Sequence, residues 1–527
     1  MTSSPRVALA ALLLSAAAVL PGCLDTSQLQ CQPNTVQCGD TCVATANDDL
    51  NCGACGAACT GGNVCVASAC VCPVGQGVCN GICTRVATDP KNCGACGVAC
   101  GAGQACNQGV CQDCPSPGGS TPGACRTALL AGCIATPGGF LQPIEDAPGG
   151  LVLAAPVNPS GATFPDALGV LGTALLYADH DSSTLYEVPI GLLSTSSAEK
   201  LSLVGPSTGS KAGTTQLLVE SADGGTGSRL YAMASSVNAL RIFDGPPPAD
   251  AGQLLNQGAG ALGLVVKGGA AFDPGSYPGS FAKLGSDVFV PLNGTGKVVR
   301  VDVSDPANAQ VKDTYDLQPL VAALPGGGVA PDGGPFTPSP TQAIARNGAV
   351  YVAANVLRYF ADFSGADYGP PLVVRIDPAK VGQAALSAVQ GFASDAGTCQ
   401  NVEWLSTLQL GSAATPMLVS CAGARSYDPT TFVVTSVQNT ALLLLDGTDR
   451  QLAAWVPSSA SGQPPPSVGR AVALNTSVYV ADETAGRVYV IDYATNGFVE
   501  RVGYVDGGTP AAACPTYITD LTLVPAP

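Results

Sequence analysis

Cysteine spacing constrains this chain more than any other feature. Of its 23 cysteines, 20 lie before residue 134. Sixteen of these form two sets of eight, and every cysteine of the first set recurs 41 residues later. The sets are Cys31, Cys38, Cys42, Cys52, Cys55, Cys59, Cys65 and Cys70, then Cys72, Cys79, Cys83, Cys93, Cys96, Cys100, Cys106 and Cys111. A repeat without insertions indicates two copies of one module, residues 31–70 and 72–111.

Each module is too short to fold around an apolar core. About 40 residues with almost no aliphatic side chains bury little surface, so four disulfide bonds per module are the expected substitute. The alternative is zinc, because Cys52 and Cys55 have the spacing of a ligand pair, as do Cys93 and Cys96. Zinc needs reduced thiolates, which an exporting compartment disfavours, and the modules contain no histidine. We therefore expect disulfides and no metal, while the spacing leaves the pairing open.

The repeated pattern resembles a known family. Residues 51–56 read NCGACG, and a C-x3-C-x5-C-x4-C ladder begins at Cys55. The pattern recurs from residue 92 and is similar to the stigma-specific Stig1-like cysteine-rich repeat, which also occurs in tandem in exported bacterial proteins. The resemblance covers residues 31–111 and implies a disulfide-stapled extracellular module that binds a partner or acts as a stalk, without catalysis.

The N-terminus predicts export and a lipid anchor. Arg6 precedes an uncharged apolar run, Val7–Leu20, which has the length of a secretory signal rather than of a membrane span. The run ends in Leu-Pro-Gly-Cys, which resembles the lipobox of bacterial lipoproteins. The resemblance implies a signal peptide at residues 1–22 and acylation of Cys23, which leaves an even 22 cysteines for disulfides. The alternative is an ordinary cleaved signal with Cys23 left for a disulfide.

The predicted location follows from this anchor. Two or more acyl chains on Cys23 would hold the protein stably on a membrane, so we expect it at a bacterial outer membrane or cell surface. No later stretch reaches about 18 uninterrupted apolar residues, and the remainder is expected outside the bilayer. The net charge is −16, with only 22 lysines and arginines and no basic run, so no nucleic-acid partner is expected.

Residues 141–527 repeat a two-strand phrase. An apolar strand that carries an aromatic residue is followed by a polar turn and a second strand that ends in aspartate. Tyr231, Phe289 and Tyr479 each precede that aspartate by 13 residues. Six copies, two of them with insertions, recur at spacings of 54, 58, 62, 68 and 60 residues. They are centred at positions 177, 231, 289, 351, 419 and 479.

This periodicity predicts an all-β fold with one four-stranded blade per repeat. The chain would then be a six- or seven-bladed β-propeller preceded by the disulfide-rich tandem repeats. The phrase resembles the YVTN and NHL-like families of propellers, a likeness that implies a fold and not a ligand. A C-terminal strand at residues 517–524 can join residues 151–153 in a seventh blade built from both chain ends. Residues 112–140, rich in proline, glycine and serine, are predicted to be a linker.

Two further disulfides are predicted around the propeller. Cys399 precedes one expected strand and Cys421 ends the next, so an antiparallel hairpin would bring them together. Cys514 precedes the final strand, and closure of the ring would bring it to Cys133 or Cys125.

Sequence motifs predict no catalytic residue. The G-x-S-x-G match around Ser207 lacks the strand–turn–helix context of a serine hydrolase, and the single histidine, His180, precedes it. The G-x-G-x-x-G match at residues 258–263 is followed by a strand-like sequence, whereas a dinucleotide site needs a helix there.

No cofactor is predicted either. Asp179 with Asp181, or Asp446 with Asp449, would offer oxygen ligands for Ca²⁺. Aspartate is also a common turn residue, and we prefer that interpretation for both pairs.

The predicted function is that of a non-enzymatic, surface-anchored lipoprotein, a binding or adhesion scaffold whose propeller recognises a protein or a glycan. The alternative is a propeller hydrolase of the lactonase kind, with a metal held by acidic residues at the central tunnel. A tunnel lined by Glu, Asp, Asn and His would distinguish the two, and one histidine with scattered aspartates leaves that set unproven.

Overall fold

The computed structural model describes residues 31–524 with internal gaps. The residues outside the description are 1–30, 32–34, 40, 49, 61–62, 73–76, 85, 87–91, 102–103, 108–109, 114–128, 135–137, 148–149, 154–155, 159–163, 172–173, 180–183, 190–198, 203–213, 222–227, 246–264, 326–327, 361–364, 390–398, 409–414, 429–433, 458–465, 475–476, 495–496, 501–512, 516–517 and 525–527. Several sequence predictions fall there, namely those on the signal peptide, Cys23, Cys125, His180, Asp181, Ser207 and residues 258–263. Among the described residues, no helix is long and apolar enough to cross a membrane.

Short antiparallel hairpins form the cysteine-rich modules. The first module contains two hairpins, β1–β2 and β3–β4, and the second contains β5–β6 and β7–β8. Their bounds are β1 (Val36–Cys38), β2 (Thr41–Val43), β3 (Val64–Val66), β4 (Ala69–Val71), β5 (Gly77–Cys79), β6 (Ile82–Thr84), β7 (Gln104–Asn107) and β8 (Val110–Asp113). Strands of three or four residues bury little, and the modules depend on their covalent bonds.

The disulfides repeat with the sequence. In the first module the bonds are Cys31–Cys42, Cys38–Cys55, Cys52–Cys65 and Cys59–Cys70. In the second, the described bonds are Cys72–Cys83, Cys79–Cys96 and Cys100–Cys111. Each of these three lies 41 residues after its counterpart in the first module, so both modules share one pairing scheme.

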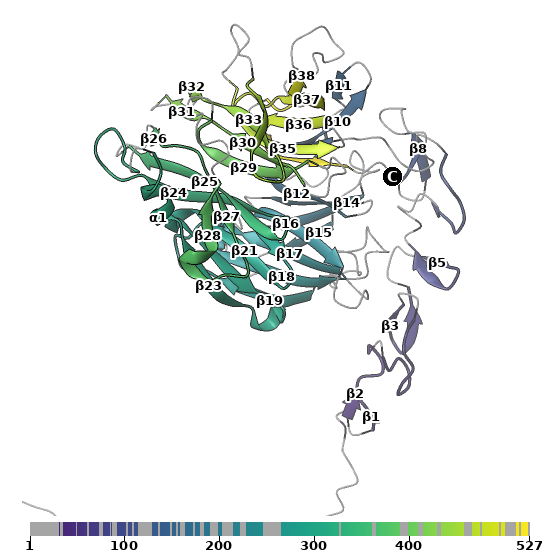
Figure 1. Cartoon of the computed structure of the whole chain (residues 1–527). Helices are drawn as coiled ribbons and strands as arrows, with labels where there is room; N and C mark the ends of the chain where they lie inside the picture. The colour runs from purple at the N-terminus through teal and green to yellow at the C-terminus, as the bar shows by residue number, and fades with distance from the viewer. Residues whose placement is uncertain are drawn as a thin grey trace, which may run out of the picture. The chain divides into compact units, whose positions relative to one another are not determined.

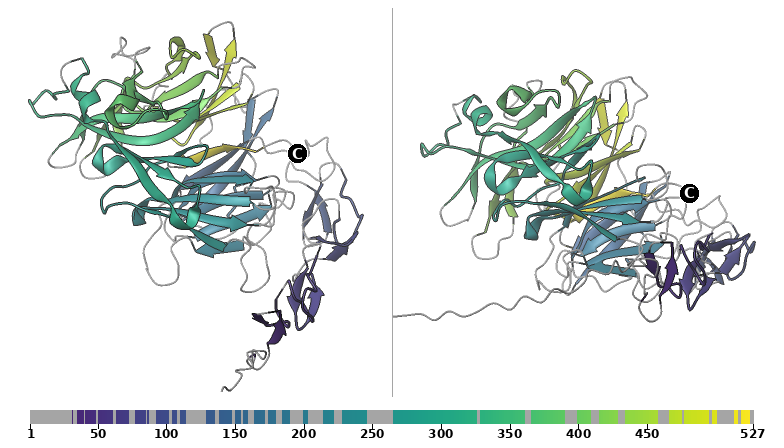
Figure 2. Two further views of the ribbon diagram at one scale, coloured as in Figure 1. Left: turned by 60° about the horizontal axis from the view of Figure 1, so that its bottom comes forward. Right: turned by 90° about the horizontal axis from the view of Figure 1, so that it is seen from below.

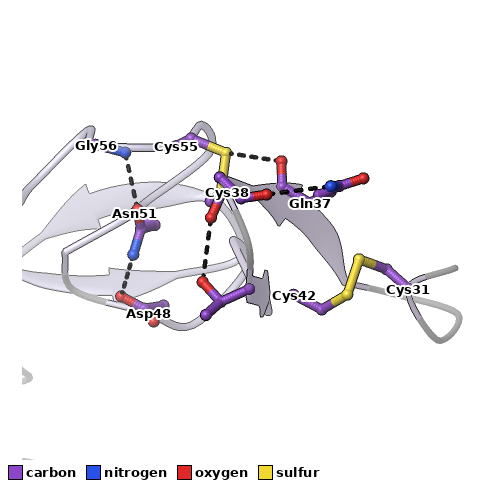
Figure 3. Close-up of a disulfide and its surroundings, with 10 residues drawn as sticks. Cys31, Gln37, Cys38, Cys42, Asp48, Asn51, Cys55 and Gly56 are labelled. Atoms are coloured by element: carbon purple, nitrogen blue, oxygen red, sulfur yellow. Dashed lines mark hydrogen bonds between the residues drawn. A yellow bond between two sulfur atoms is a disulfide. The ribbon is translucent and has the colours of Figure 1, made fainter. Parts of the chain in front are cut away.

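The NCGACG stretch forms a tight turn that is held by hydrogen bonds of the Asn51 side chain. The Asn51 side chain accepts a hydrogen bond from the Gly56 N–H at 2.8 Å and donates one to Asp48 at 3.2 Å (Figure 3). Gly53 and Gly56 have φ of +75° and +73°, a region that favours glycine. Asn92 accepts from Gly97 at the same distance in the second module. The repeated non-cysteine positions therefore encode a turn that brings the cysteines into bonding range.

Seven antiparallel sheets, six of four strands and one of five, form the part of the chain from residue 129 onward, which is a seven-bladed β-propeller (Figures 1 and 2). Six blades are formed by consecutive strands. They are β12 (Pro165–Leu171), β13 (Ala174–Asp179), β14 (Thr184–Pro189) and β15 (Glu199–Ser202); β16 (Thr214–Ser221), β17 (Ser228–Ala234), β18 (Ala239–Gly245) and β19 (Val265–Ala271); β20 (Ala282–Leu284), β21 (Asp287–Leu292), β22 (Lys297–Asp302) and β23 (Gln310–Asp316); β24 (Thr337–Arg346), β25 (Ala349–Tyr359), β27 (Leu372–Ile376) and β28 (Leu386–Ala388); β29 (Val402–Thr407), β30 (Met417–Cys421), β33 (Ala441–Leu445) and β34 (Gln451–Trp455); β35 (Val468–Leu474), β36 (Ser477–Asp482), β37 (Val488–Ala494) and β38 (Gly497–Glu500).

Two blades carry insertions between their second and third strands. Blade 4 adds β26 (Ala366–Tyr368), which pairs with β25. Blade 5 adds a hairpin of β31 (Ala424–Tyr427) and β32 (Val434–Gln438). One short α-helix, α1 (Gln318–Ala322), lies between blades 3 and 4. We call the end of the blades at which the second strand connects to the third the site face.

The seventh blade closes the ring from both ends of the propeller sequence. Its order is β11 (Gly150–Leu153), β10 (Gly139–Ala147), β9 (Leu129–Ile134) and β39 (Ile518–Leu523). Residues 151–153 share this blade with the C-terminal strand, as the sequence suggests, but β39 pairs with β9 and not with β11. The propeller also begins at Leu129, within the stretch interpreted as a linker, and not at residue 141.

A disulfide reinforces this closure. Cys133 in β9 is bonded to Cys514, across 381 residues of sequence, and both side chains are at most 1% exposed. The sequence predicts Cys133 or Cys125 as the disulfide partner of Cys514, and in the structure the partner is Cys133. Cys399 and Cys421 are also bonded, and Val402 next to them is paired with Cys421 in the expected antiparallel hairpin.

The aromatic residues of the phrase form much of the core. Tyr177, Tyr231, Phe289, Tyr351 and Tyr479 are all at most 3% exposed and pack between neighbouring blades. Burial of large apolar surface at each blade contact is the main stabilising contribution of such a ring.

The aspartate of the phrase has a local role. It ends the third strand, where it meets charged or turn-forming partners rather than the blade contacts. Asp244 accepts from Arg229 at 2.9 Å, and Asp302 pairs with Lys312 at 2.9 Å. Asp446 accepts hydrogen bonds from the backbone of Thr448. The aspartate thus fixes the end of the third strand and the turn that follows.

Candidate ligand-binding site

Bulges in the innermost strands turn polar side chains toward the next blade. Six of the seven innermost strands have a register shift, for example between Pro340 and Gln342 in β24 and between Val402 and Trp404 in β29. A bulge re-aims side chains that would otherwise alternate in and out of the sheet. The Gln342 side chain accepts from the backbone N–H of Leu405 in the next blade. Asp520 accepts from the N–H of Leu168 in the same way, at 2.6 Å.

An Arg–Glu–Glu cluster occupies the site face of blades 5 and 6. Arg425 Nη2 forms ion pairs with Glu403 and Glu483, at 3.4 Å from the Glu403 oxygen. The Arg425 side chain also donates to Ser467 Oγ at 2.8 and 3.1 Å, and Ser467 donates onward to a backbone carbonyl. The Trp404 indole N–H donates to Glu483 Oε1 at 3.0 Å. The side chains of Arg425, Glu403 and Glu483 are only 15%, 18% and 19% exposed.

The chain brings these residues together from separate elements. Glu403 lies at the bulge of β29, Glu483 follows the last residue of β36, and Arg425 lies in the inserted strand β31. The disulfide Cys399–Cys421 joins the segment before β29 to the segment before β31. It therefore ties the backbone of Glu403 to that of Arg425.

Burial and neighbouring charges shift the pKa values of two side chains in this cluster, Glu483 and Arg425. Burial, as the largest cause, and the neighbouring Glu403 together raise the pKa of Glu483 to about 8, although the charge of Arg425 opposes the rise. Burial acts to lower the pKa of Arg425, but the neighbouring Glu403 and Glu483 hold it above its usual value. At pH 7 the side chain of Glu483 therefore retains its proton.

A second ion pair lies beside the first. Arg470 in β35 pairs with Asp520 in β39, and its guanidinium lies 5.7 Å from the centre of the Trp404 ring. That distance fits a cation–π contact. Burial raises the pKa of Asp520, and the charge of Arg470 opposes the rise. Trp404 is thus fixed by Glu483 through its N–H and by Arg470 across its ring.

A cavity of about 280 Å³ opens beside Trp404. It is lined by Ser235, Tyr277, Pro278, Gly279, Ser280, Asn293, Thr341, Glu403 and Trp404. These residues belong to blades 2 to 5 and the segments between them. Glu403 carries the only carboxyl group among them, and Tyr277 and Trp404 contribute aromatic surface. A concave site with apolar walls and a few fixed polar groups is the usual form of a small-molecule site.

Tyr277 enters this lining from a strained backbone. Its φ is +45°, which is rare for a bulky residue, and Pro278 follows it. The Asn238 side chain accepts the Tyr277 N–H at 2.9 Å and helps to hold the conformation. The side chain is 62% exposed, so the strain is not retained to fill the core. Strain of about 1–3 kcal/mol at an exposed aromatic residue suggests a functional position.

The aspartates considered for Ca²⁺ have other partners. Asp179 is buried and accepts the N–H of Phe164 at 2.9 Å. Asp449 pairs with Arg346 at 2.5 Å and accepts from Tyr351 at 3.1 Å, while Asp446 caps its own turn. Asp446 thus acts as a turn residue, whereas Asp179 and Asp449 contact residues that are distant in the sequence.

Cysteines make up every group of three close metal-ligating side chains in the described part of the chain. The groups are Cys52 with Cys59 and Cys70, and Cys93 with Cys100 and Cys111. Each contains a disulfide, Cys59–Cys70 or Cys100–Cys111. A sulfur held in a disulfide is not a thiolate ligand, so the geometry favours the disulfide interpretation over zinc.

Sequence reasoning missed Glu403, Arg425 and Glu483. One signal was present, because Glu483 directly follows Asp482, which ends the first strand of the last phrase. Nothing in the sequence indicates that Glu403 and Arg425 meet it.

Comparisons with known proteins bear on the fold. No family model and no curated protein matches the chain. A putative 6-phosphogluconolactonase from Bacteroides fragilis is 10% identical over 76% of this chain and 98% of its own, with a TM-score of 0.45. AztD from Citrobacter koseri is 13% identical over 76% and 98%, with a TM-score of 0.37. A periplasmic gluconolactonase from Pseudomonas aeruginosa is 13% identical over 77% and 83%, with a TM-score of 0.30. The assignment of seven blades therefore rests on strand order and not on these likenesses.

Proposed function

We propose that this protein is a surface-anchored lipoprotein whose propeller binds an uncharged glycan in the cavity beside Trp404. The observation that carries the proposal is the lining itself. Tyr277 and Trp404 offer aromatic surface, while Ser235, Asn293 and Thr341 offer hydrogen-bonding groups. Sugars present apolar C–H faces and polar hydroxyl edges, and a pocket that recognises them needs both kinds of surface.

Charge supports a neutral ligand. Glu403 pairs with Arg425, and Arg470 pairs with Asp520. With its pKa raised to about 8, Glu483 remains protonated at pH 7. Among the described residues, the site therefore has no unpaired guanidinium to hold a phosphate and no surplus carboxylate to hold a strong cation.

The anchor is proposed from Cys23 and fits the disulfide-rich modules. Disulfides persist in oxidising compartments, outside the bacterial cytoplasm. Substitution Cys23→Ser should move the protein from the membrane fraction to the soluble fraction. A variant that stays membrane-bound, with no acyl mass on the wild-type protein, would refute the anchor and leave the binding proposal untouched.

The binding proposal has a well-matched test. Trp404 and Trp455 each donate an indole N–H to a glutamate at 3.0 Å, but only Trp404 lines the cavity. The full chain is screened on an array of neutral and charged glycans, and hits are titrated by calorimetry. We expect neutral hits, a loss of about tenfold or more in affinity for Trp404→Phe, and wild-type affinity for Trp455→Phe. Absence of any glycan binding, or equal affinity of the two variants, would overturn the proposal.

A second candidate function, hydrolysis, is favoured by one observation. Glu403 and Glu483 pair with the same guanidinium nitrogen, and the pKa of Glu483 is raised to about 8, as in catalytic carboxyl pairs of which one member holds a proton. Arg425 engages an oxygen of each, which is why binding is preferred. Turnover of a sugar lactone by the wild-type chain, abolished in Glu483→Gln, would establish hydrolysis instead.

A further inference from the structure

We propose that Gly469 is a positioning residue for Trp404, because the absence of a side chain at position 469 leaves the space from which Glu483 holds the indole. Trp404 lines the cavity, whereas Gly469 acts on the cavity only through Glu483. The inference rests on the proposed function for its consequence alone, a change in the affinity for a sugar.

Glu483 occupies the space that a side chain at position 469 would fill. A Cβ atom added to Gly469 would lie 2.6 Å from Glu483 Oε1 and 2.8 Å from Glu483 Cδ. Favourable contacts between such atoms lie at about 3.5–4.0 Å. Oε1 is also the atom that accepts the Trp404 N–H at 3.0 Å. Any residue other than glycine would therefore displace the hydrogen-bond acceptor itself.

A bulge in β35 places Gly469 at this position. The register of β35 shifts between Val468 and Ala471, so Gly469 and Arg470 stand opposite a single residue of β36. β35 packs beside β29, the strand that carries Trp404 (Figure 1). The Arg470 guanidinium lies 5.7 Å from the centre of the Trp404 ring. The bulge thus acts on Trp404 twice, through the space at its first residue and through the charge at its second.

Glycine at this position sets blade 6 apart from four other blades with a bulge. We compare the residue that directly follows the last regular pair before the register shift. It is threonine in blades 2, 4 and 7 and glutamate in blade 5, namely Thr215, Thr341, Thr519 and Glu403. Thr341 and Thr519 each donate a hydrogen bond to a backbone carbonyl of the next blade. In blade 6 the threonine is absent, and Glu483 fills its place.

The fold should tolerate a side chain at position 469. Gly469 does not have a positive φ, so its backbone suits any residue. The three atoms closest to an added Cβ all belong to the Glu483 side chain and none to the backbone. Because a side chain can rotate away, a substitution should move Glu483 and leave blade 6 folded. Threonine is the sharpest choice, since the bulges of three other blades already contain it.

Tryptophan fluorescence tests the inference without any ligand. The chain has two tryptophans, so the Trp455→Phe background leaves Trp404 as the only one. In this full-length background, Gly469→Thr, Glu483→Ala and the double variant are compared by emission wavelength and by quenching with acrylamide. Each single variant should shift the emission to longer wavelength and increase quenching, because the released indole gains contact with water. The double variant should go no further, because both substitutions remove the same hydrogen bond.

Two more variants separate this effect from general damage. Gly469→Ala should repeat the shift of Gly469→Thr, because its Cβ alone occupies the space. The matched control is Gly169→Ala, which lies at the bulge of β12 and whose Cβ would meet Leu217 Cβ at an ordinary 3.7 Å. This control should keep the emission of the background protein. Guanidinium unfolding of each variant verifies that the compared proteins are folded.

Sugar affinity gives the functional consequence. Methyl glycosides of glucose, galactose and mannose are the neutral probes, titrated by calorimetry. A probe that binds the wild type should bind Gly469→Thr about fivefold more weakly, the equivalent of one hydrogen bond. A shifted emission with unchanged sugar affinity would overturn the role of Gly469 in binding.

The remaining outcomes separate this inference from the proposed function. Unshifted emission in Gly469→Thr, or a double variant whose shift is the sum of the two single shifts, would overturn the positioning of Trp404 by Gly469. Absence of sugar binding to the wild type would refute the proposed function instead, and the emission experiment would still decide whether Gly469 positions Trp404.

Discussion

Opening the ring provides the sharpest test of how this propeller is held together. The double variant Cys133→Ala, Cys514→Ala removes a bond that spans 381 residues. The matched variant Cys399→Ala, Cys421→Ala removes one that spans 22. All four side chains are at most 1% exposed, so the packing lost at the substituted positions is similar. The difference between the variants then reports on loop closure.

Chain entropy sets the magnitude. A cross-link restricts the unfolded chain more when it closes a longer loop, and the dependence is logarithmic. For the long loop the entropy model gives about 6 kcal/mol, and for the short loop about 3 kcal/mol. We therefore expect the ring-closing bond to contribute about 2 to 3 kcal/mol more to the free energy of unfolding. The β9–β39 pairing remains in the variant and keeps the blade intact.

Guanidinium unfolding of the two double variants, followed by circular dichroism, measures this difference. The slope of the free energy against denaturant concentration should rise in both, because their unfolded chains are less restricted, and more in the ring-opened one. Equal losses, or a larger loss for Cys399→Ala, Cys421→Ala, would refute the reasoning. In that case the bonds would act through local strain or packing and not through closure of the ring.

Two further predictions concern protons and thiols. Because the pKa of Glu483 is raised to about 8, the folded state keeps a proton that the unfolded state gives up above its ordinary pKa. This contribution is complete at acid pH and declines, by on the order of 1 kcal/mol per pH unit, until the pH passes about 8. In unfolding titrations from pH 5 to 9, Glu483→Gln should lack this decline, and Glu500→Gln, which removes the partner of Trp455, should retain it. Thiol titration of the denatured, unreduced protein should find no free thiol, whereas about eight thiols with bound zinc would favour metal modules.

The sequence predicts the regular parts of the fold because those parts repeat. The cysteine-rich module repeats every 41 residues, and the two-strand phrase repeats in each of six blades. Corresponding positions of the repeats lie in similar structural environments, and similar environments require similar residues. The closing blade lies outside this rule. Leu129–Ile134 follows a stretch rich in proline and glycine and lacks the phrase, so the sequence places it in a linker. Its pairing with β10 on one side and with β39 on the other makes it a strand of the propeller.

The candidate site escapes prediction for a different reason. Glu403, Arg425 and Glu483 belong to three elements, and each is an ordinary polar residue in its own segment. Their meeting depends on a bulge, an inserted hairpin and a turn, which have no periodic signature. The raised pKa of Glu483 arises from that meeting and has no counterpart in the sequence.

The departures from the repeat nevertheless mark where the site lies. In three uninterrupted copies of the phrase, the aromatic residue precedes the final aspartate by 13 residues, but Tyr351 precedes Asp377 by 26. The copy of blade 5, from Val419 to Asp446, spans 27. These two copies are the ones that carry β26 and β31–β32, and Arg425 lies in β31. A repeated blade needs no insertion for its own stability, since packing against its neighbours already buries it. The two insertions lie in adjacent blades and on the site face, so we infer that they contribute to the function of the site face rather than to the stability of the ring.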